Sequence, residues 1–139
     1  MLTLAIIKPD AVAAGNTGKI LAHLEAEGFV IRGARLVRLT RPEAEAFYAV
    51  HRERPFFGSL CAFMTSGPAL ALALDRESAV THLREVIGAT DPAEARAGTV
   101  RKLYAQSKER NAIHASDSTE NGVREVAFFF TERDLVGTT

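Results

Sequence analysis

The sequence lacks the features of a secreted or membrane-bound chain. It has one cysteine, Cys61, in an apolar run, so an internal disulfide is excluded and the thiol is expected in the core. The apolar run at the start, MLTLAII, is too short for a signal peptide or a membrane span and is interrupted by Lys8, Pro9 and Asp10. We therefore expect a cytoplasmic protein without a membrane partner.

The sequence also lacks net charge, because 17 basic residues balance 17 acidic ones. A domain that binds nucleic acid broadly normally has a basic surplus, so no specific nucleic-acid partner is expected. Repeats, low-complexity tracts and long polar linkers are missing as well, and 139 residues are enough to bury one core. The chain is predicted to be a single domain over residues 1–139.

The most informative stretch is NAIHASDSTE, residues 111–120. It begins as a short strand that carries His114. Asp117 then resembles a helix N-cap, with Glu120 at the spacing of a capping box. Apolar residues follow at helical spacing, so a helix is predicted over residues 118–128.

On that helix Glu125 can face back toward His114. A carboxylate that holds one imidazole nitrogen fixes the tautomer and leaves the other nitrogen free as a nucleophile. The alternative is a hydrogen-bonded structural histidine before an ordinary capped helix. These residues alone leave both interpretations open.

Other segments predict further strands and helices. Residues 2–7 are predicted to form a strand, and Lys8 lies at its end. The alternative interpretation of Lys8 is a solvated surface amine. The segment GNTGK resembles a P-loop but fails the motif, since Ala13 and Ile20 stand at two required positions. Thr17 is instead expected to cap a helix that is closed by Gly28.

The middle of the chain continues the alternation. Residues 29–39 predict a strand with one wet face, on which the arginines are solvated. Thr40 and Glu43 predict a capping box that begins a helix running through Phe47 and Tyr48. A second helix is expected over residues 58–64, followed by a strand over 69–74. Asp75 is expected to cap a helix that ends at Gly88, and residues 90–92 to begin a short helix. Tyr48 either belongs to the core or presents its hydroxyl.

The expected order is β, α, β, α, α, β, α, short α, β, α. Strict alternation of strands and helices is absent, which favours an α+β fold over a doubly wound sheet. We expect an antiparallel or mixed sheet with helices packed on one face.

The histidine segment closely resembles the active-site segment of the nucleoside diphosphate kinase family, usually Asn-x-x-His-Gly-Ser-Asp-x-x-Glu, with Ala115 where glycine is commoner. The resemblance extends through AIIKPDAV, ERPFFGSLCAFMTSGP, GATDP and GTVR, in that order, along essentially the whole chain. It implies a ferredoxin-like βαββαβ core with an antiparallel four-stranded sheet and added helices.

The resemblance implies ping-pong exchange of the terminal phosphate between nucleoside triphosphates, typically ATP, and diphosphates, through a phosphohistidine at His114. It also implies roles for the other site residues. Phosphates would be held by Lys8, Arg84, Thr90 and Arg101, the ribose by Asn111, and the base by Phe56 with Leu60 nearby. Tyr48 would position Lys8, and Ser116 and Glu125 would tie down the imidazole.

Magnesium is expected to arrive on the nucleotide without a direct protein ligand, Asp117 contacting it through water. Lys108 departs from the family, which more often has an aliphatic residue opposite Phe56. Hexameric members commonly have proline at the position of Ala97. The resemblance therefore implies a homo-oligomer that is either a tetramer or a hexamer. Two other classes remain as alternatives, a nucleotide-binding module without turnover and a small interaction domain with a structural histidine.

Overall fold

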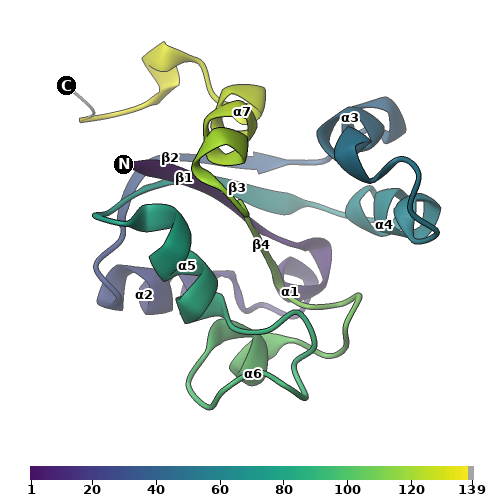
Figure 1. Ribbon diagram of the computed structural model, residues 1–139, viewed down its shortest axis with the longest axis horizontal. Helices are drawn as coiled ribbons and strands as arrows, with labels where there is room; N and C mark the ends of the chain where they lie inside the picture. Colours follow the sequence, from purple (N-terminus) through teal and green to yellow (C-terminus); the bar gives the residue numbers. More distant parts are fainter. Residues whose placement is uncertain (138–139) are drawn as a thin grey trace.

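The computed structural model describes residues 1–137; the last two residues of the predicted domain, 138–139, lie outside the described residues. Figure 1 shows a sheet with helices packed around it. The elements are β1 (Leu2–Ile7), α1 (Pro9–Ala13), α2 (Thr17–Ala26), β2 (Val30–Val37), α3 (Arg41–Phe47), η1 (Ala49–His51), α4 (Phe57–Met64), β3 (Ala69–Asp75), α5 (Ala79–Ile87), α6 (Val100–Tyr104), β4 (Ile113–Ala115), α7 (Thr119–Phe129) and η2 (Glu132–Asp134).

The sheet has four strands in the order β2-β3-β1-β4. Each neighbouring pair is antiparallel, with β1 and β3 at the centre. The two central strands are the most apolar, and their residues are almost all buried. The predicted α+β fold with an antiparallel four-stranded sheet is confirmed.

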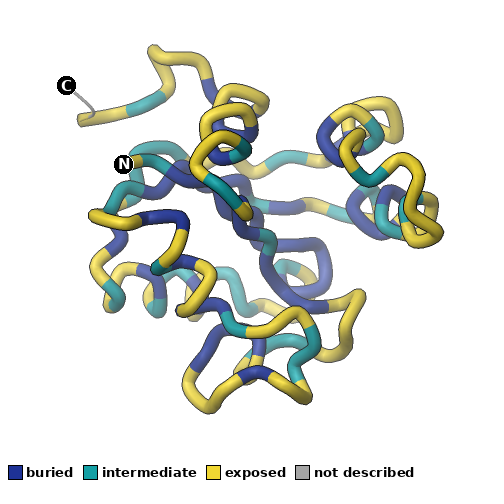
Figure 2. The backbone as a smooth tube through the Cα atoms, in the orientation of Figure 1, coloured by how far each residue is buried: buried dark blue, intermediate teal, exposed yellow. Residues whose placement is uncertain are grey.

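Helices cover both faces of the sheet, so the expectation of one covered face is wrong. Leu4 and Ile6 pack with α3, α4 and α7, whereas Ala5 and Ile7 pack with α2 and α5. Successive strand residues point to opposite faces, and β1 is apolar in both registers, so each face needs a cover. Figure 2 shows the resulting buried centre under exposed helices.

Strand β2 lies at the edge of the sheet, and only part of its predicted wet face is free. Arg38 is exposed as expected. Arg32 instead pairs with Asp75 at 3.2 Å, and Arg35 donates to the carbonyl oxygen of Phe129. Burial along β2 does not alternate, so the prediction of one wet face is wrong, and the sequence could not show which acceptors on other elements come within reach.

The helix starts were predicted with mixed success. The capping box of Thr40 and Glu43 is confirmed. The cap at Asp75 is wrong, because this residue ends β3 and binds the N-terminal amine at 3.0 Å, and α5 begins at Ala79. Residues 90–92 form turns rather than a helix. The next helix, α6, is instead capped by Thr99.

Helix α1 was not predicted. Pro9 ends the strand but also occupies the first position of this helix, where a missing N–H costs nothing. The predicted cap at Thr17 is off by one residue, since Thr17 is the first residue of α2 and Asn16 precedes it. Cys61 lies in the core as predicted. Over residues 1–137, the helices are too short or too polar to traverse a bilayer.

Candidate active site

His114 sits on the short edge strand β4, opposite Ile6 of the central strand β1. Its ring meets the edges of two aromatic rings, Phe47 at 5.4 Å and Tyr48 at 6.1 Å between centroids. Only 18% of the side chain is exposed. The imidazole is therefore enclosed by packing, with a small part of its surface open to solvent.

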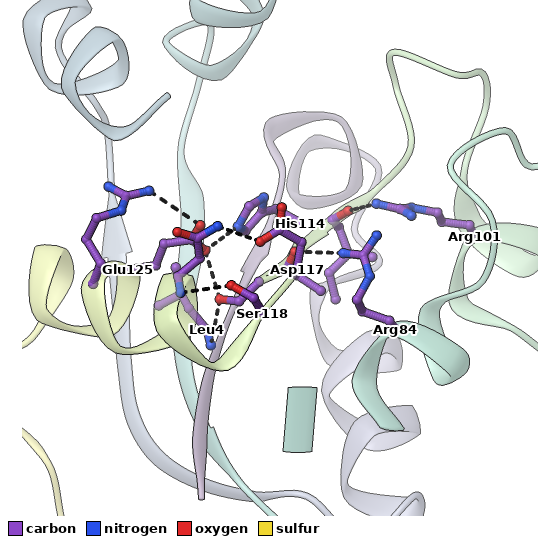
Figure 3. Close-up of polar contacts among 12 residues, drawn as sticks. Leu4, Arg84, Arg101, His114, Asp117, Ser118 and Glu125 are labelled. Carbon is purple, nitrogen blue, oxygen red and sulfur yellow. Dashed lines mark hydrogen bonds and ion pairs between the residues drawn. The ribbon is translucent and has the colours of Figure 1, made fainter. Parts of the chain in front are cut away.

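Glu125 of α7 faces His114, as the helical spacing predicted. Its Oε1 lies 2.7 Å from Nε2 of His114 and also accepts a hydrogen bond from the hydroxyl of Ser116 at 2.8 Å. Figure 3 shows Glu125 beside His114. The Ser116 hydroxyl in turn accepts from the backbone N–H of Leu4. The polar chain thus ties the imidazole to the central strand.

The charge state of this pair follows from its surroundings. Burial alone would raise the pKa of Glu125, but the hydrogen bonds from His114 and Ser116 and the nearby imidazole lower it. Burial lowers the pKa of His114 from its ordinary 6.5, more than Glu125 raises it. An ionised carboxylate can only accept, so Nε2 carries the proton and Nδ1 has a free lone pair at neutral pH.

The start of α7 differs from the prediction by one residue. Ser118, not Asp117, is the N-cap, and its hydroxyl accepts from the backbone N–H of Asn121 at 3.0 Å. Asp117 accepts from the side-chain amide of Asn121, which lowers the pKa of Asp117. Both serine and aspartate favour an N-cap, so the sequence alone could not separate the two neighbours.

Lys8 reaches the histidine from the end of β1. Its side chain is buried, and Nζ donates to the side-chain oxygen of Asn111 at 2.9 Å. Burial, assisted by the nearby Arg101, lowers the pKa of Lys8 to about 8. With this pKa the amine is still mostly protonated at neutral pH, and it is held in a fixed position rather than free in solvent.

Two arginines lie on the side of His114 away from Glu125, as Figure 3 shows. The buried Arg101 donates to three carbonyl oxygens, those of Gly88, Asn111 and Ile113. Arg84 is exposed and, among residues 1–137, donates only to the carbonyl oxygen of Ala115. Burial lowers the pKa of Arg101 to about 10, with Arg84 adding to the effect. Arg101 therefore remains cationic at neutral pH.

A cavity of about 670 Å³ brings these groups together. Its wall includes every residue predicted to bind nucleotide, which are Lys8, Phe56, Leu60, Arg84, Thr90, Arg101 and Asn111. His114, Tyr48, Asp117 and Glu125 line it too, whereas Ser116 is fully buried behind them. Phe56, 48% exposed, and Lys108 line the same cavity as these cationic groups.

Tyr48 is placed differently from the predicted contact. Its ring is buried, and in the part of the chain that the structure describes its hydroxyl has no hydrogen-bond partner. Burial raises the pKa of Tyr48, so the phenol stays protonated and can donate. Of the two alternatives from the sequence the core placement is confirmed, and Tyr48 also lines the cavity while its hydroxyl stays buried.

Sequence reasoning missed several residues of the site. Asn121, Arg124 and His51 line the cavity, and Arg124 also lies 3.6 Å from Glu125. Within residues 1–137, no group of three or more His, Cys, Asp or Glu side chains could hold a metal ion.

A neutral imidazole with a free nitrogen, facing fixed cations across a cavity, is the arrangement of a phosphotransferase that works through histidine. The family model described as nucleoside diphosphate kinase matches residues 2–135. The chain belongs to the nucleoside diphosphate kinase family, and its enzyme class is phosphotransferase.

Individual relatives agree. The nucleoside diphosphate kinase of Geobacter sp. (strain M21) is 52% identical over 134 residues, which cover 96% of this chain and 98% of that protein. The enzyme of Sulfurimonas denitrificans is 53% identical over 133 residues, 96% and 97% of the two chains. Both matches span nearly the full length.

Solved structures give the same result. The Aquifex aeolicus nucleoside diphosphate kinase superposes with a TM-score of 0.95 at 46% identity, covering 97% of this chain and 98% of that one. A halophilic nucleoside diphosphate kinase from Halobacterium salinarum, solved in complex with CDP, has a TM-score of 0.93 at 36% identity. It covers 98% of this chain and 91% of its own.

Proposed function

We propose that the protein transfers the terminal phosphate of a nucleoside triphosphate, typically ATP, to a nucleoside diphosphate through a phosphohistidine at Nδ1 of His114. The observation that carries this proposal is the 2.7 Å contact between Nε2 and Glu125. It occupies one ring nitrogen and leaves the other free on a cavity that also holds Lys8 and Arg101.

The first half of the reaction forms a nitrogen–phosphorus bond. The Nδ1 lone pair attacks the terminal phosphorus, the bond from phosphorus to the bridging oxygen breaks, and the diphosphate leaves with the electron pair. A second diphosphate then attacks the phosphohistidine and restores the neutral imidazole. Donor and acceptor therefore use one site in turn, which gives ping-pong kinetics.

The residues around His114 have proposed roles in this cycle. Charge spreads over the equatorial oxygens of the transferring phosphoryl group, so fixed cations and donors stabilise the transition state. Lys8, Arg84, Arg101 and Thr90 would supply them. Asn111 would meet the ribose 3′-hydroxyl, while Ser116 and Glu125 would orient the imidazole. Phe56 and Leu60 would hold the base.

Magnesium would enter on the nucleotide phosphates. The ionised Asp117 carboxylate lines the cavity beside Asn121, a position suited to contact the ion through water. The bound ion would supply neutralising charge between the phosphate oxygens. The chain's own residues supply the nucleophile and the remaining cations.

Terminally labelled ATP tests the proposal. Label that becomes bound to the protein, survives base, is lost in acid and passes to added GDP is the expected result. Protein that binds ATP without taking up label would instead be a nucleotide-binding module. Failure to bind or label would leave a small interaction domain with a structural histidine.

The enzyme is expected to use adenine, guanine and pyrimidine nucleotides alike, within about tenfold in kcat/KM. Strong discrimination requires buried polar groups that a wrong base leaves unpaired. Lys108 and Glu109, which line the cavity together with Phe56, are exposed, so water satisfies them whichever base is bound. Stacking on Phe56 serves every base.

A panel of diphosphate acceptors at fixed ATP measures this, in parallel with Phe56→Ala and with Leu103→Ala, an exposed apolar residue outside the cavity, as the control. Phe56→Ala should raise KM for all bases to a similar degree, and Leu103→Ala should not. A hundredfold preference for one base would reveal an edge-reading contact and contradict the expectation.

The protein is also proposed to assemble as a homo-oligomer, a tetramer or a hexamer, in the cytoplasm. The edge strand β2 exposes Val30 and Leu36, an apolar strip that suits association with another copy. The single, buried Cys61 thiol suits a reducing compartment. Light scattering should give the mass of several chains. A stable monomer at micromolar concentration would contradict the assembly.

A further inference from the structure

Asp10 is a buried carboxyl group that the proposed chemistry does not use. It lies in α1, beside the loop that leads into β4 (Figure 1), and is 6% exposed. Its Oδ2 accepts the backbone N–H of Ala112 at 3.1 Å. Its Oδ1 is buried without a hydrogen-bond partner among residues 1–137. Burying a carboxyl group in this way opposes folding, so a local structural purpose is expected.

The residue that Asp10 holds has a strained backbone. Ala112 has φ of +73°, in the left-handed region that a Cβ atom disfavours. The N–H of Ile113 donates to the carbonyl oxygen of Asn111 at 2.9 Å, which closes a three-residue turn around Ala112. A turn of this kind with positive φ at its centre is rare and strained. Such strain persists only where the surroundings enforce it.

The segment at residues 8–10 hydrogen-bonds both backbone polar groups of Ala112. The N–H of Lys8 donates to the Ala112 carbonyl oxygen at 2.9 Å, while Asp10 accepts the Ala112 N–H. The Lys8 side chain meanwhile binds the preceding residue, Asn111. Asn111 is the first residue of the turn, and His114 lies two residues after Ala112. The turn therefore fixes how both side chains project toward the cavity.

We propose that Asp10 is a positioning residue that holds Ala112 in its left-handed turn and thereby sets Asn111 and His114 in register with bound nucleotide. This inference rests on the proposed function. Without the carboxyl group Ala112 relaxes toward negative φ, and the imidazole and the ribose contact move relative to each other.

The test compares kcat for transfer from ATP to GDP among Asp10 variants. Asp10→Ala is expected to lower kcat by about ten- to a hundredfold, the scale of loss from displaced catalytic groups. Asp10→Asn should fall between this variant and the wild type, because a neutral oxygen is a weaker acceptor than a carboxylate.

The Ala112→Gly substitution distinguishes positioning from a merely structural role of Asp10, because only positioning predicts that glycine restores kcat. Glycine adopts positive φ without a steric penalty, so Ala112→Gly should raise kcat of Asp10→Ala by about fivefold or more. Its effect in the wild-type background should be smaller, since Asp10 already holds the turn there. Asp134→Ala is the matched control, as Asp134 also accepts a backbone N–H, that of Thr131, but lies in η2 outside the cavity.

Two results would overturn the proposal. One is wild-type kcat in Asp10→Ala; the other is an equal effect of Ala112→Gly with and without Asp10. If Asp10→Ala does not fold, Asp10→Asn takes its place. The ratio of kcat with and without Ala112→Gly is then measured in Asp10→Asn and compared with the ratio in the wild type. Labelling of the wild type is measured in parallel. Its absence would count against the proposed function, whereas labelling without an Asp10 effect removes only the positioning role.

Discussion

Replacing His114 with alanine should abolish both phosphate transfer and labelling of the protein by ATP, while nucleotide binding survives. The substitution removes the nucleophile. Among residues 1–137, no other imidazole on the cavity wall is hydrogen-bonded to Glu125. The proposed phosphate contacts come from other segments, Lys8 after β1 and Arg101 in α6. The His114→Ala variant should therefore bind nucleotide without transferring phosphate.

Steady-state transfer, label uptake and nucleotide titration together measure the effect. His23→Ala is a matched control, because His23 lies in α2 away from the cavity. Circular dichroism shows whether the loss of the ring beside Phe47 disturbs the fold. Turnover of His114→Ala near the wild-type rate would disprove the phosphohistidine mechanism.

Replacing Lys8 with alanine should lower kcat by about a hundredfold or more, a loss typical of a fixed group removed from where charge develops. The Lys8 amine is buried and oriented by Asn111, so solvent cannot readily take its place. Lys19→Ala removes an exposed lysine from α2 and serves as the control. If Lys8→Ala raised KM and left kcat unchanged, Lys8 would bind ground state and transition state equally.

The pH dependence gives a second measure of Lys8. The group acts as a cation, so kcat/KM should fall as the pH rises through about 8, where the free enzyme loses this proton. Bound phosphate favours the charged amine, and the corresponding limb of kcat should lie at higher pH. In Lys8→Arg the limb near pH 8 should disappear, even if the absolute rate is lower. An unchanged limb in this variant would assign it to another group.

The sequence predicted the histidine site well because short-range spacing determines much of it. Glu125 lies seven positions after Ser118, about two helical turns, so the carboxylate can face back toward His114 whichever neighbour caps the helix. The uncertainty between Asp117 and Ser118 moved the helix start by one residue without changing that face.

Features that depend on distant contacts were not predictable. Asp75 looks like a helix cap in isolation, but strand pairing places it against Met1 and Arg32, across the sheet. The two covered faces of the sheet likewise depend on how helices far apart in sequence pack on β1. The family resemblance supplied the strand arrangement that periodicity alone did not.

The contact between Asp10 and Ala112 shows the same limit at the site. The two residues lie 102 positions apart, and nothing in the local sequence marks an alanine for positive φ. A glycine there would have signalled the turn, since glycine adopts that conformation freely. Strain at a non-glycine residue became visible only in the structure.

Arg101 has a thermodynamic consequence of its own. Its three bonds to backbone carbonyl oxygens immobilise the guanidinium in the folded protein, before any nucleotide arrives. Freezing an arginine side chain costs roughly 1.5–2 kcal/mol of conformational entropy, and here folding rather than binding bears that cost. The exposed Arg84, with one such bond, must lose its freedom each time a substrate docks. In a cycle that loads and empties the same site twice, a cation that needs no reordering favours rapid exchange of one nucleotide for the next.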